Sequence, residues 1–273
     1  RYCQPTGGSR QCGTRGFQPV EWTDQGIVLS ARRLGEGSAI VTLLTEAQGR
    51  HAGLVRGAGG KRSRGMIMLG NTVHATWRAR LADHLGTMRL EPAVSRTSAV
   101  LDDPVRLAAL ASAATLLAGG LPEREAHPVL FRATTILFDA IAAATDDWVE
   151  AYFGWELGLL SELGFGLDLS RCAGSGVADN LGYVSPKSAR AVSLDAGQPY
   201  AEKLLPLPRF LVGQRGRPVA NHPGTDWADA ARLTGHFLER HVFPREDGGL
   251  PAARGRFVEL LLRKNTTSGV LPG

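Results

Sequence analysis

The residues best suited to chemistry lie in one stretch of the chain, from Arg50 to Ala82, and they are cations. This stretch holds seven arginines and lysines and not one aspartate or glutamate. Ordinary solvated surfaces intersperse the two signs of charge, so this run favours a surface that binds a polyanion. Glycines at 57, 59, 60 and 65 surround three of the cations and would let backbone amides approach phosphate groups. We therefore predict contact with nucleic acid, and a merely solvated basic loop is the alternative.

The candidate nucleic-acid-binding residues are the cations of this stretch and one arginine from an earlier segment: Arg33, Arg50, Arg56, Lys61, Arg62, Arg64, Arg78 and Arg80. Each phosphate that they neutralise should steepen the salt dependence of binding by about 0.9 log units. Trp77 lies among them and could stack on an unpaired base. Alternation along a strand instead places Trp77 opposite to Arg78 and Arg80, so we expect it to pack in the core.

Motifs for catalysis or nucleotide binding do not accompany these cations. A phosphate-binding loop would need glycine at position 55 and a hydroxyl residue at position 62, where the chain has Val55 and Arg62. Ser175 lies between two glycines but lacks the wider glycine frame of a hydrolase nucleophile. The seven histidines do not pair with a carboxylate at metal-ligand spacing. The sequence predicts neither an enzyme nor a cofactor.

The apolar positions change their period near residue 92, and this change separates two classes of structure. Before it, apolar residues recur at every second position and predict five short strands, at 26–34, 38–45, 50–56, 70–80 and 86–91. Five strands in so short a stretch favour a closed barrel, because an open sheet would expose both edges. The segment 57–65, between the third and fourth strands, is expected to be a flexible loop.

After Pro92 the spacing is helical. Helix starts are predicted at Asp102-Asp103-Pro104, His127-Pro128 and Asp146-Asp147, and later helices at about 226–240 and 253–264. Residues 148, 152, 155 and 159 form a stripe that we expect to be buried, with a peptide-binding groove as the alternative. The predicted class is α+β: a disordered lead-in at 1–20, a barrel at 21–92, a helical domain at 93–264 with an irregular insertion at about 165–224, and a flexible tail at 265–273.

Charge is segregated along the chain. The net charge is +5, yet residues 101–168 carry three cations against eleven anions. Basic ends and an acidic middle indicate surfaces that face different partners. Three cysteines cannot form a disulfide framework, and the long apolar stretch at 107–118 falls well short of the roughly 20 residues that a membrane span needs. We expect a cytoplasmic protein without a membrane segment.

Two local signatures resemble the bacterial RecO family of DNA repair proteins. The first is EWTDQGIVLS at 21–30, followed by Gly35-Glu36 and by LVRGA at 54–58. The second is LGLLSELGFGLDL at 157–169, followed by Cys172 and by LGYVSPKS at 181–188. The resemblance covers residues 21–264. It implies an N-terminal OB-fold, a C-terminal helical domain, binding of single- and double-stranded DNA, and annealing of complementary strands.

The resemblance also implies protein partners and association with the nucleoid. Members of this family work with RecR and RecF to load the recombinase RecA onto DNA coated by single-strand-binding protein, whose C-terminal tail is expected to dock on the helical domain. A rival from another class is an OB-fold RNA-binding or translation-associated protein, whose basic loop would read the 2′-hydroxyl.

Some members of the family hold zinc with two C-x-x-C pairs in the insertion, and this chain departs from that pattern. Only Cys172 remains, and the matching positions are Ser175, Ser193 and Ala196. A single thiolate cannot hold a structural zinc, so we expect no metal. The insertion should instead be held by packing around three residues, Leu181, Tyr183 and Val184.

Overall fold

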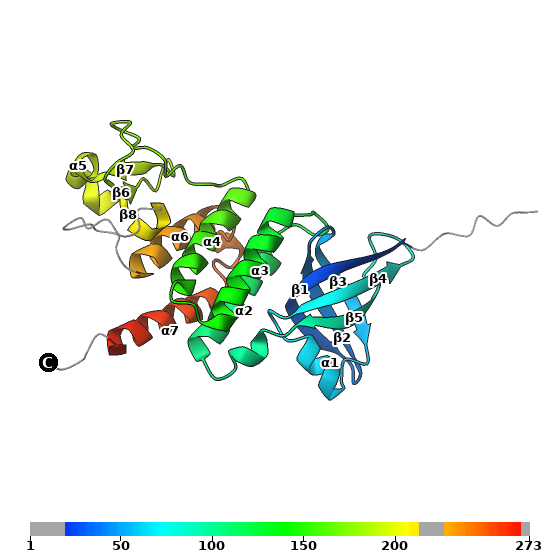
Figure 1. Ribbon diagram of the computed structural model, residues 1–273. Coiled ribbons are helices and arrows are strands. Elements are labelled where there is room, and N and C mark those ends of the chain that lie inside the picture. The colour runs from blue at the N-terminus through cyan, green and yellow to red at the C-terminus, as the bar shows by residue number, and fades with distance from the viewer. Residues whose placement is uncertain (1–19, 213–226, 269–273) are drawn as a thin grey trace, which may run out of the picture.

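The N-terminal part of the chain folds into a closed five-stranded barrel. The computed structural model describes residues 20–212 and 227–268, and its barrel strands are hydrogen-bonded in the order β1-β2-β3-β5-β4, with β4 paired to β1 (Figure 1). A five-stranded barrel of this order is the OB-fold, so that prediction is confirmed. Its elements are β1 (Val20–Leu34), β2 (Ser38–Thr45), β3 (Gly49–Arg56), α1 (Lys61–Met66), β4 (Thr72–Ala79) and β5 (Thr87–Val94).

Alternation along the strands fills the barrel with apolar side chains. Val41 and Leu43 of β2 and Val73 of β4 are completely buried in its core. Trp77 is only 1% exposed, and its Nε1 donates a hydrogen bond to the carbonyl of Leu85 at 2.9 Å. The expectation that Trp77 packs in the core is confirmed, and its ring is not a platform for bases.

The segment between β3 and β4 is not a loop throughout, because α1 occupies its middle. The N–H of Arg64 donates to the carbonyl of Gly60 at 2.9 Å, and Asn71 Nδ2 donates to the carbonyl of Gly65 at 2.8 Å. Ala58, ahead of the helix, is buried and its N–H donates to the carbonyl of Gly37. The loop prediction is wrong at 61–65, since contacts with the barrel define a helix that the local sequence does not signal.

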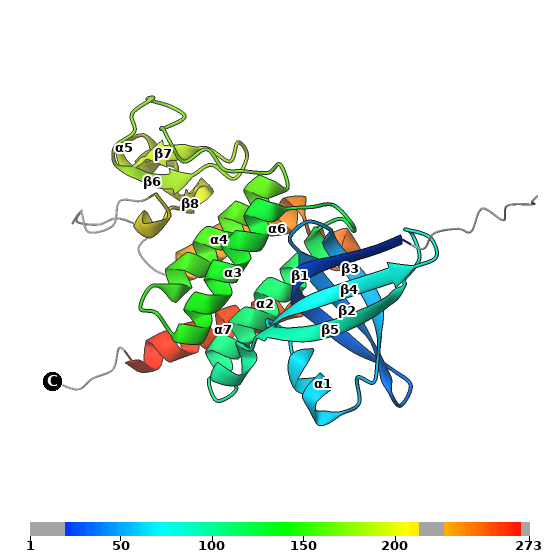
Figure 2. The same ribbon diagram turned by 45° about the vertical axis from the view of Figure 1, so that its right-hand side comes forward.

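The helical domain is organised around α2, which packs against β1 on one side and against α3 and α7 on others (Figures 1 and 2). The predicted start is confirmed: Asp103 accepts hydrogen bonds from the N–H groups of Val105 at 3.0 Å and Arg106 at 3.1 Å. Asp147 precedes α4 but makes no side-chain capping bond. The long helices are α2 (Pro104–Gly120), α3 (Pro128–Ala143), α4 (Trp148–Glu162), α6 (Trp227–His241) and α7 (Ala252–Ser268).

Two predictions at the chain ends meet the structure only in part. Because α7 continues to Ser268, the predicted tail is wrong at 265–268, and residues 269–273 lie outside the described residues. The predicted lead-in also lies outside them up to residue 19, and Val20 already begins β1.

The predicted stripe on α4 is confirmed, since Tyr152, Trp155 and Leu159 are buried and Trp148 is half-buried.

The insertion carries more regular structure than predicted. A three-stranded sheet of order β7-β6-β8 forms its centre, and Leu181, Tyr183 and Val184 of β6 are buried as expected. The prediction of an irregular segment is therefore wrong over these strands, while residues 213–224 lie outside the described residues. The remaining elements are β6 (Leu181–Val184), β7 (Ala191–Ser193), α5 (Leu194–Gly197), β8 (Leu205–Pro206) and the 3₁₀ turns η1 (Thr97–Ala99), η2 (Gln198–Lys203), η3 (Arg209–Val212) and η4 (Arg245–Asp247).

The barrel and the helical domain share one hydrophobic core. Ile27 and Leu29 of β1 and Leu44 of β2 are buried in the same cluster as Leu110 of α2. Val28, between the first two, belongs to the barrel core instead. A strand buried on both faces reads as a continuous apolar run, and the sequence Ile27-Val28-Leu29 is such a run. The helical domain therefore covers an apolar outer face of the barrel, while the barrel also has a core of its own.

A buried arginine strengthens this junction just after β5. Arg96 is 3% exposed, and its Nε donates to Asp139 Oδ1 of α3 at 2.6 Å. Its Nη1 donates to the hydroxyl of Thr72 at 2.5 Å, and its backbone N–H donates to Asn71 Oδ1 at 2.8 Å. The guanidinium thus connects α3 to the start of β4.

A second point of contact requires glycine at the start of β3. Gly49 has a φ of +67°, and a Cβ built there would lie 1.9 Å from the carbonyl oxygen of Glu125. The chain between α2 and α3 therefore approaches the barrel more closely than any larger residue would permit. Gly49 and Arg96 fix the barrel to the helical domain at two separate places.

Candidate nucleic-acid interface

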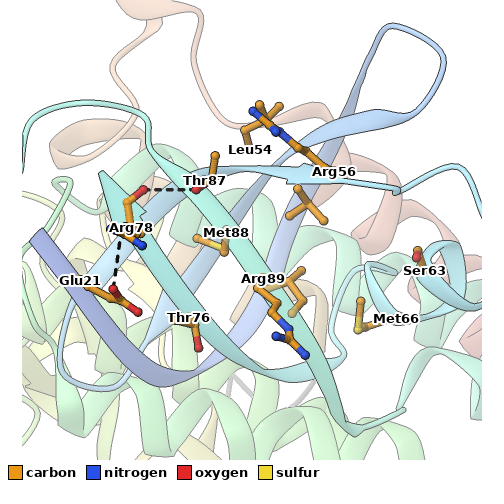
Figure 3. Close-up of a pocket in the computed structure, with 12 residues that line it drawn as sticks. Glu21, Leu54, Arg56, Ser63, Met66, Thr76, Arg78, Thr87, Met88 and Arg89 are labelled. Carbon is orange, nitrogen blue, oxygen red and sulfur yellow. Dashed lines mark hydrogen bonds and ion pairs between the residues drawn. The ribbon is translucent and has the colours of Figure 1, made fainter. Parts of the chain in front are cut away.

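A groove on the barrel collects cations from three strands. It lies where β3 meets β5, two strands that share the single parallel pair of Leu54 with Thr87, and α1 closes one end (Figure 3). Its volume is about 420 Å³. The lining residues are Glu21, Leu54, Val55, Arg56, Ser63, Met66, Thr76, Arg78, Thr87, Met88, Arg89 and Leu90. We call this cavity the arginine groove.

Three exposed arginines give the arginine groove its charge. Arg56 ends β3, Arg78 lies on β4 and Arg89 lies on β5. Among the lining residues Glu21 is the one carboxylate, and its Oε2 lies 3.8 Å from Arg78 Nε. Strand alternation explains the placement, because the outward positions of β4 and β5 carry these arginines while Met88 and Leu90 point inward. The arrangement suits a chain of phosphates that crosses the strands.

We expect Glu21→Gln to tighten the binding of DNA about threefold to tenfold at low salt. The substitution removes a negative charge from the rim, and two unit charges about 4 Å apart in water interact by about 1 kcal/mol. Stability should change little, since the Glu21 and Arg78 side chains are 52% and 61% exposed. Fluorescence anisotropy with labelled single strands measures the affinity.

Asp179→Asn, an equal change of charge at an exposed position in the insertion, is the matched control for that substitution. Its effect on DNA affinity should be small. If the two substitutions changed the affinity equally, the rim of the arginine groove would not be a place of contact with phosphate.

Four of the other predicted cations lie on α1 or in a cavity that an α1 residue lines, and Arg80 follows β4. Arg33 and Arg64 line a second cavity of about 230 Å³ beside the turn between β1 and β2. Arg62 lines a third of about 190 Å³ beside residues 92–95. Lys61 is exposed on α1, and Arg80 is exposed just after β4. Of the eight predicted residues, the arginine groove therefore brings together Arg56 and Arg78.

Arg89 is a member of the groove that the sequence interpretation missed. It lies outside the anion-free stretch and next to Glu91, whose Oε1 is 3.5 Å from its Nη2. The available signal was the alternation of Thr87, Arg89 and Glu91 on the predicted fifth strand, which places all three on the outer face.

Arg50 lies apart from these cations, at the contact between the domains. Its Nε donates to the carbonyl of Leu121 at 2.8 Å, and its Nη1 donates to Glu123 Oε1 at 3.3 Å. Its side chain is only 21% exposed. The anion-free stretch of the sequence therefore meets anions from elsewhere in the fold, Glu123 at Arg50 and Glu21 at Arg78.

The aromatic residues of the barrel form an internal cluster. The rings of Trp22 and Trp77 stack with centroids 5.7 Å apart, and the ring of His51 meets both edge-on at 4.9 Å and 4.6 Å. Burial, and then the positive charge of Arg124, lower the pKa of His51 below its ordinary value, so this ring is neutral at neutral pH. These aromatic rings stabilise the barrel interior, and none of them lines the arginine groove.

The four positions that match the family's zinc ligands do converge in the insertion. The N–H of Ser175 and the hydroxyl of Ser193 each donate to Cys172 Sγ at 3.4 Å. A Cβ built on Gly174 would lie 4.0 Å from both Cys172 Sγ and the Cβ of Ala196. Burial opposes ionisation of the Cys172 thiol, but hydrogen bonds from Ser175 and Ser193 outweigh it and lower the pKa to about 6. One thiolate does not fit a structural zinc, and hydroxyl and amide donors surround it instead.

We expect the triple variant Ser175→Cys/Ser193→Cys/Ala196→Cys to acquire one zinc ion. Four thiolates around zinc lie about 3.8 Å apart, and the Ser193 hydroxyl already lies 3.4 Å from Cys172 Sγ. Zinc at about a hundred times its Kd should stabilise the variant by about 2.7 kcal/mol, or roughly 5–10 °C in Tm. Atomic emission and thermal unfolding measure the two effects.

The double variant Ser175→Cys/Ser193→Cys lacks the fourth ligand and is the control for zinc binding. It should bind zinc more weakly than the triple variant. A triple variant that folds and binds no zinc would show that these positions do not converge as described.

Two other features, a metal site and a membrane-spanning helix, were sought among the described residues. Within residues 20–212 and 227–268, no group of three or more histidine, cysteine, aspartate or glutamate side chains could hold a metal ion. Over the same ranges, no helix has both the length and the apolar character to cross a membrane.

Comparison with known proteins places most of the chain in one family. Residues 20–95 match the family described as "Recombination protein O N terminal", and residues 101–247 match "Recombination protein O C terminal". A DNA repair protein RecO from Rhodospirillum centenum is 50% identical over 255 residues, which cover 93% of this chain and 99% of that protein. A DNA repair protein RecO from Rhodospirillum rubrum is 48% identical over 248 residues, covering 89% of this chain and 97% of that protein. The chain therefore belongs to the RecO family of DNA repair proteins.

Proposed function

We propose that this protein is a non-catalytic mediator of DNA repair that binds DNA through the arginine groove and anneals complementary strands. The observation that carries the proposal is the convergence of Arg56, Arg78 and Arg89 on one groove of an OB-fold. Such barrels bind nucleic acid through basic grooves that follow the backbone and tolerate sequence. Cations that neutralise phosphates on two strands let the strands approach and pair. Annealing needs no nucleotide, because pairing is downhill once the phosphates are screened.

The wider role that we propose follows the family. In the cytoplasm, at the nucleoid, the protein would act with RecR and RecF to load RecA onto DNA coated by single-strand-binding protein. The acidic tail of that coating protein would be the point of recruitment. The acidic segment at 101–168 would keep DNA on the barrel, since like charges repel.

A strand-annealing assay tests this function. Complementary oligonucleotides are coated with the cognate single-strand-binding protein, and pairing is followed without nucleotide across a salt series. We expect the protein to accelerate pairing and the acceleration to fade as salt rises. No acceleration by folded protein would overturn the annealing proposal.

A competition assay separates DNA from RNA as the ligand. The names of the relatives favour DNA. Labelled DNA is displaced by unlabelled DNA or RNA of equal length and sequence. A clear preference for RNA would support the rival OB-fold RNA-binding protein.

A further inference from the structure

The floor of the arginine groove is apolar, and phosphate contacts do not require that. Leu54 and Met66 line the groove and are partly exposed, whereas Met88 and Leu90 also line it but belong to the barrel core and are at least nine-tenths buried. A sugar-phosphate backbone could be bound by the cations alone, without an apolar surface. A volume of about 420 Å³ falls in the range of pockets that enclose small organic groups. The nucleobases of a DNA strand are flat and weakly polar, and they alternate with its phosphates. An apolar pocket that opens between arginines therefore suits a nucleobase.

The side chains of the floor suit a nucleobase of any kind. Two of the three methionines of the chain, Met66 and Met88, line the groove, and no aromatic residue does. Methionine is flexible, adapts to irregular shapes, and makes favourable sulfur contacts with aromatic rings. The hydroxyls of Ser63 and Thr76 at the edge of the groove can bond to the polar edge of a base. Methionines would replace the aromatic platforms that other OB-folds use, without selecting one base.

We propose that the arginine groove takes one unpaired nucleobase against Leu54 and Met66, beside the buried Met88, while Arg56, Arg78 and Arg89 hold the flanking phosphates. This inference rests on the proposed function, because it names the form of DNA that the same site prefers. Bases of a duplex are stacked and paired and cannot enter. The groove therefore distinguishes a single strand from a duplex, whereas the arginines alone bind both.

The first test uses the unaltered protein. Binding is measured by anisotropy with an oligothymidylate and with a strand of the same length in which every nucleotide is abasic. The two ligands carry the same phosphates and differ only in their bases. We expect the oligothymidylate to bind about threefold to tenfold more tightly, since a contact of a base with an apolar or sulfur-bearing side chain is of this order. Equal affinity would overturn the inference.

A pair of variants at Met66 locates the preference in the groove. Met66 is half-buried on α1 and packs against the barrel core, so Met66→Ser removes the contact at some cost in stability, and circular dichroism checks that the variant is folded. Met66→Leu keeps the apolar volume and is the matched control. We expect Met66→Ser to bind the two strands equally while its affinity for duplex stays unchanged, and Met66→Leu to keep the preference. A preference that persists in Met66→Ser would overturn the assignment to this groove.

Variants of the groove arginines distinguish a failure of this inference from a failure of the proposed function. Arg56→Gln/Arg89→Gln should weaken binding of the intact strand, the abasic strand and the duplex alike. If it does, and the unaltered protein binds intact and abasic strands equally, the groove binds DNA but takes no base. If the unaltered protein binds neither strand nor duplex, the proposed function itself is overturned.

Discussion

Glu156→Gln should lower the free energy of unfolding by about 3–5 kcal/mol, because it leaves a buried guanidinium without its counter-charge. Glu156 is completely buried on α4, and the Arg254 side chain on α7 is 6% exposed. Arg254 Nε donates to Glu156 Oε1 at 2.7 Å, and its Nη2 donates to Oε2 at 2.9 Å. The hydroxyl of Thr234 on α6 also donates to Oε2, at 2.5 Å. One carboxylate therefore connects three helices.

Urea unfolding followed by circular dichroism measures this loss. Glu259→Gln breaks an exposed pair with Arg263 on α7 and should change stability by less than about 0.5 kcal/mol. Replacing both partners, in Glu156→Leu/Arg254→Met, should recover much of the loss, because apolar residues of similar volume often substitute for a buried pair without penalty. A loss in Glu156→Gln no larger than in Glu259→Gln would contradict the buried pair.

Arg56→Glu/Arg78→Glu/Arg89→Glu should weaken the binding of DNA by about two to three orders of magnitude at low salt. Each reversal removes a phosphate partner and adds a charge that repels the strand. The slope of log affinity against log salt should also fall, by about 2.7 for a duplex if each of the three arginines neutralises one phosphate. Anisotropy titrations across a salt series measure both quantities.

Three exposed cations of the helical domain give the matched control for these reversals. Arg171→Glu/Lys187→Glu/Arg256→Glu changes the net charge equally and leaves the barrel unaltered. We expect this control to weaken binding far less and to leave the salt slope nearly unchanged. Equal losses in the two triple variants would mean that overall charge, and not the arginine groove, governs binding to DNA.

The barrel could be predicted from the sequence because its signals are local. Alternation identified the five strands and placed Trp77 inside, and Asp103-Pro104 marked the start of α2. The two signatures at 21–30 and 157–188 pointed to the family that the comparisons confirm. The inferences about the strands and about the start of α2 use residues within a few positions of one another.

The site was harder to predict because its charges depend on distant partners. Arg50 was taken as a contact for DNA, but its partners Leu121 and Glu123 lie more than 70 residues further along the chain. Arg89 was passed over because it lies outside the anion-free stretch at 50–82, although the fold places it in the lining of the groove. The helix α1 was read as a loop, since packing on the barrel and not its own composition determines it.

The shared core determines how this protein can be divided. Cutting the chain after β5 would uncover Ile27, Leu29 and Leu44 on the barrel and the face of α2 that covers them. Exposed apolar patches of this kind promote aggregation. The OB-fold of this chain is therefore not expected to be stable when transplanted alone into another protein. Truncated or engineered variants should keep the barrel and the helical domain together.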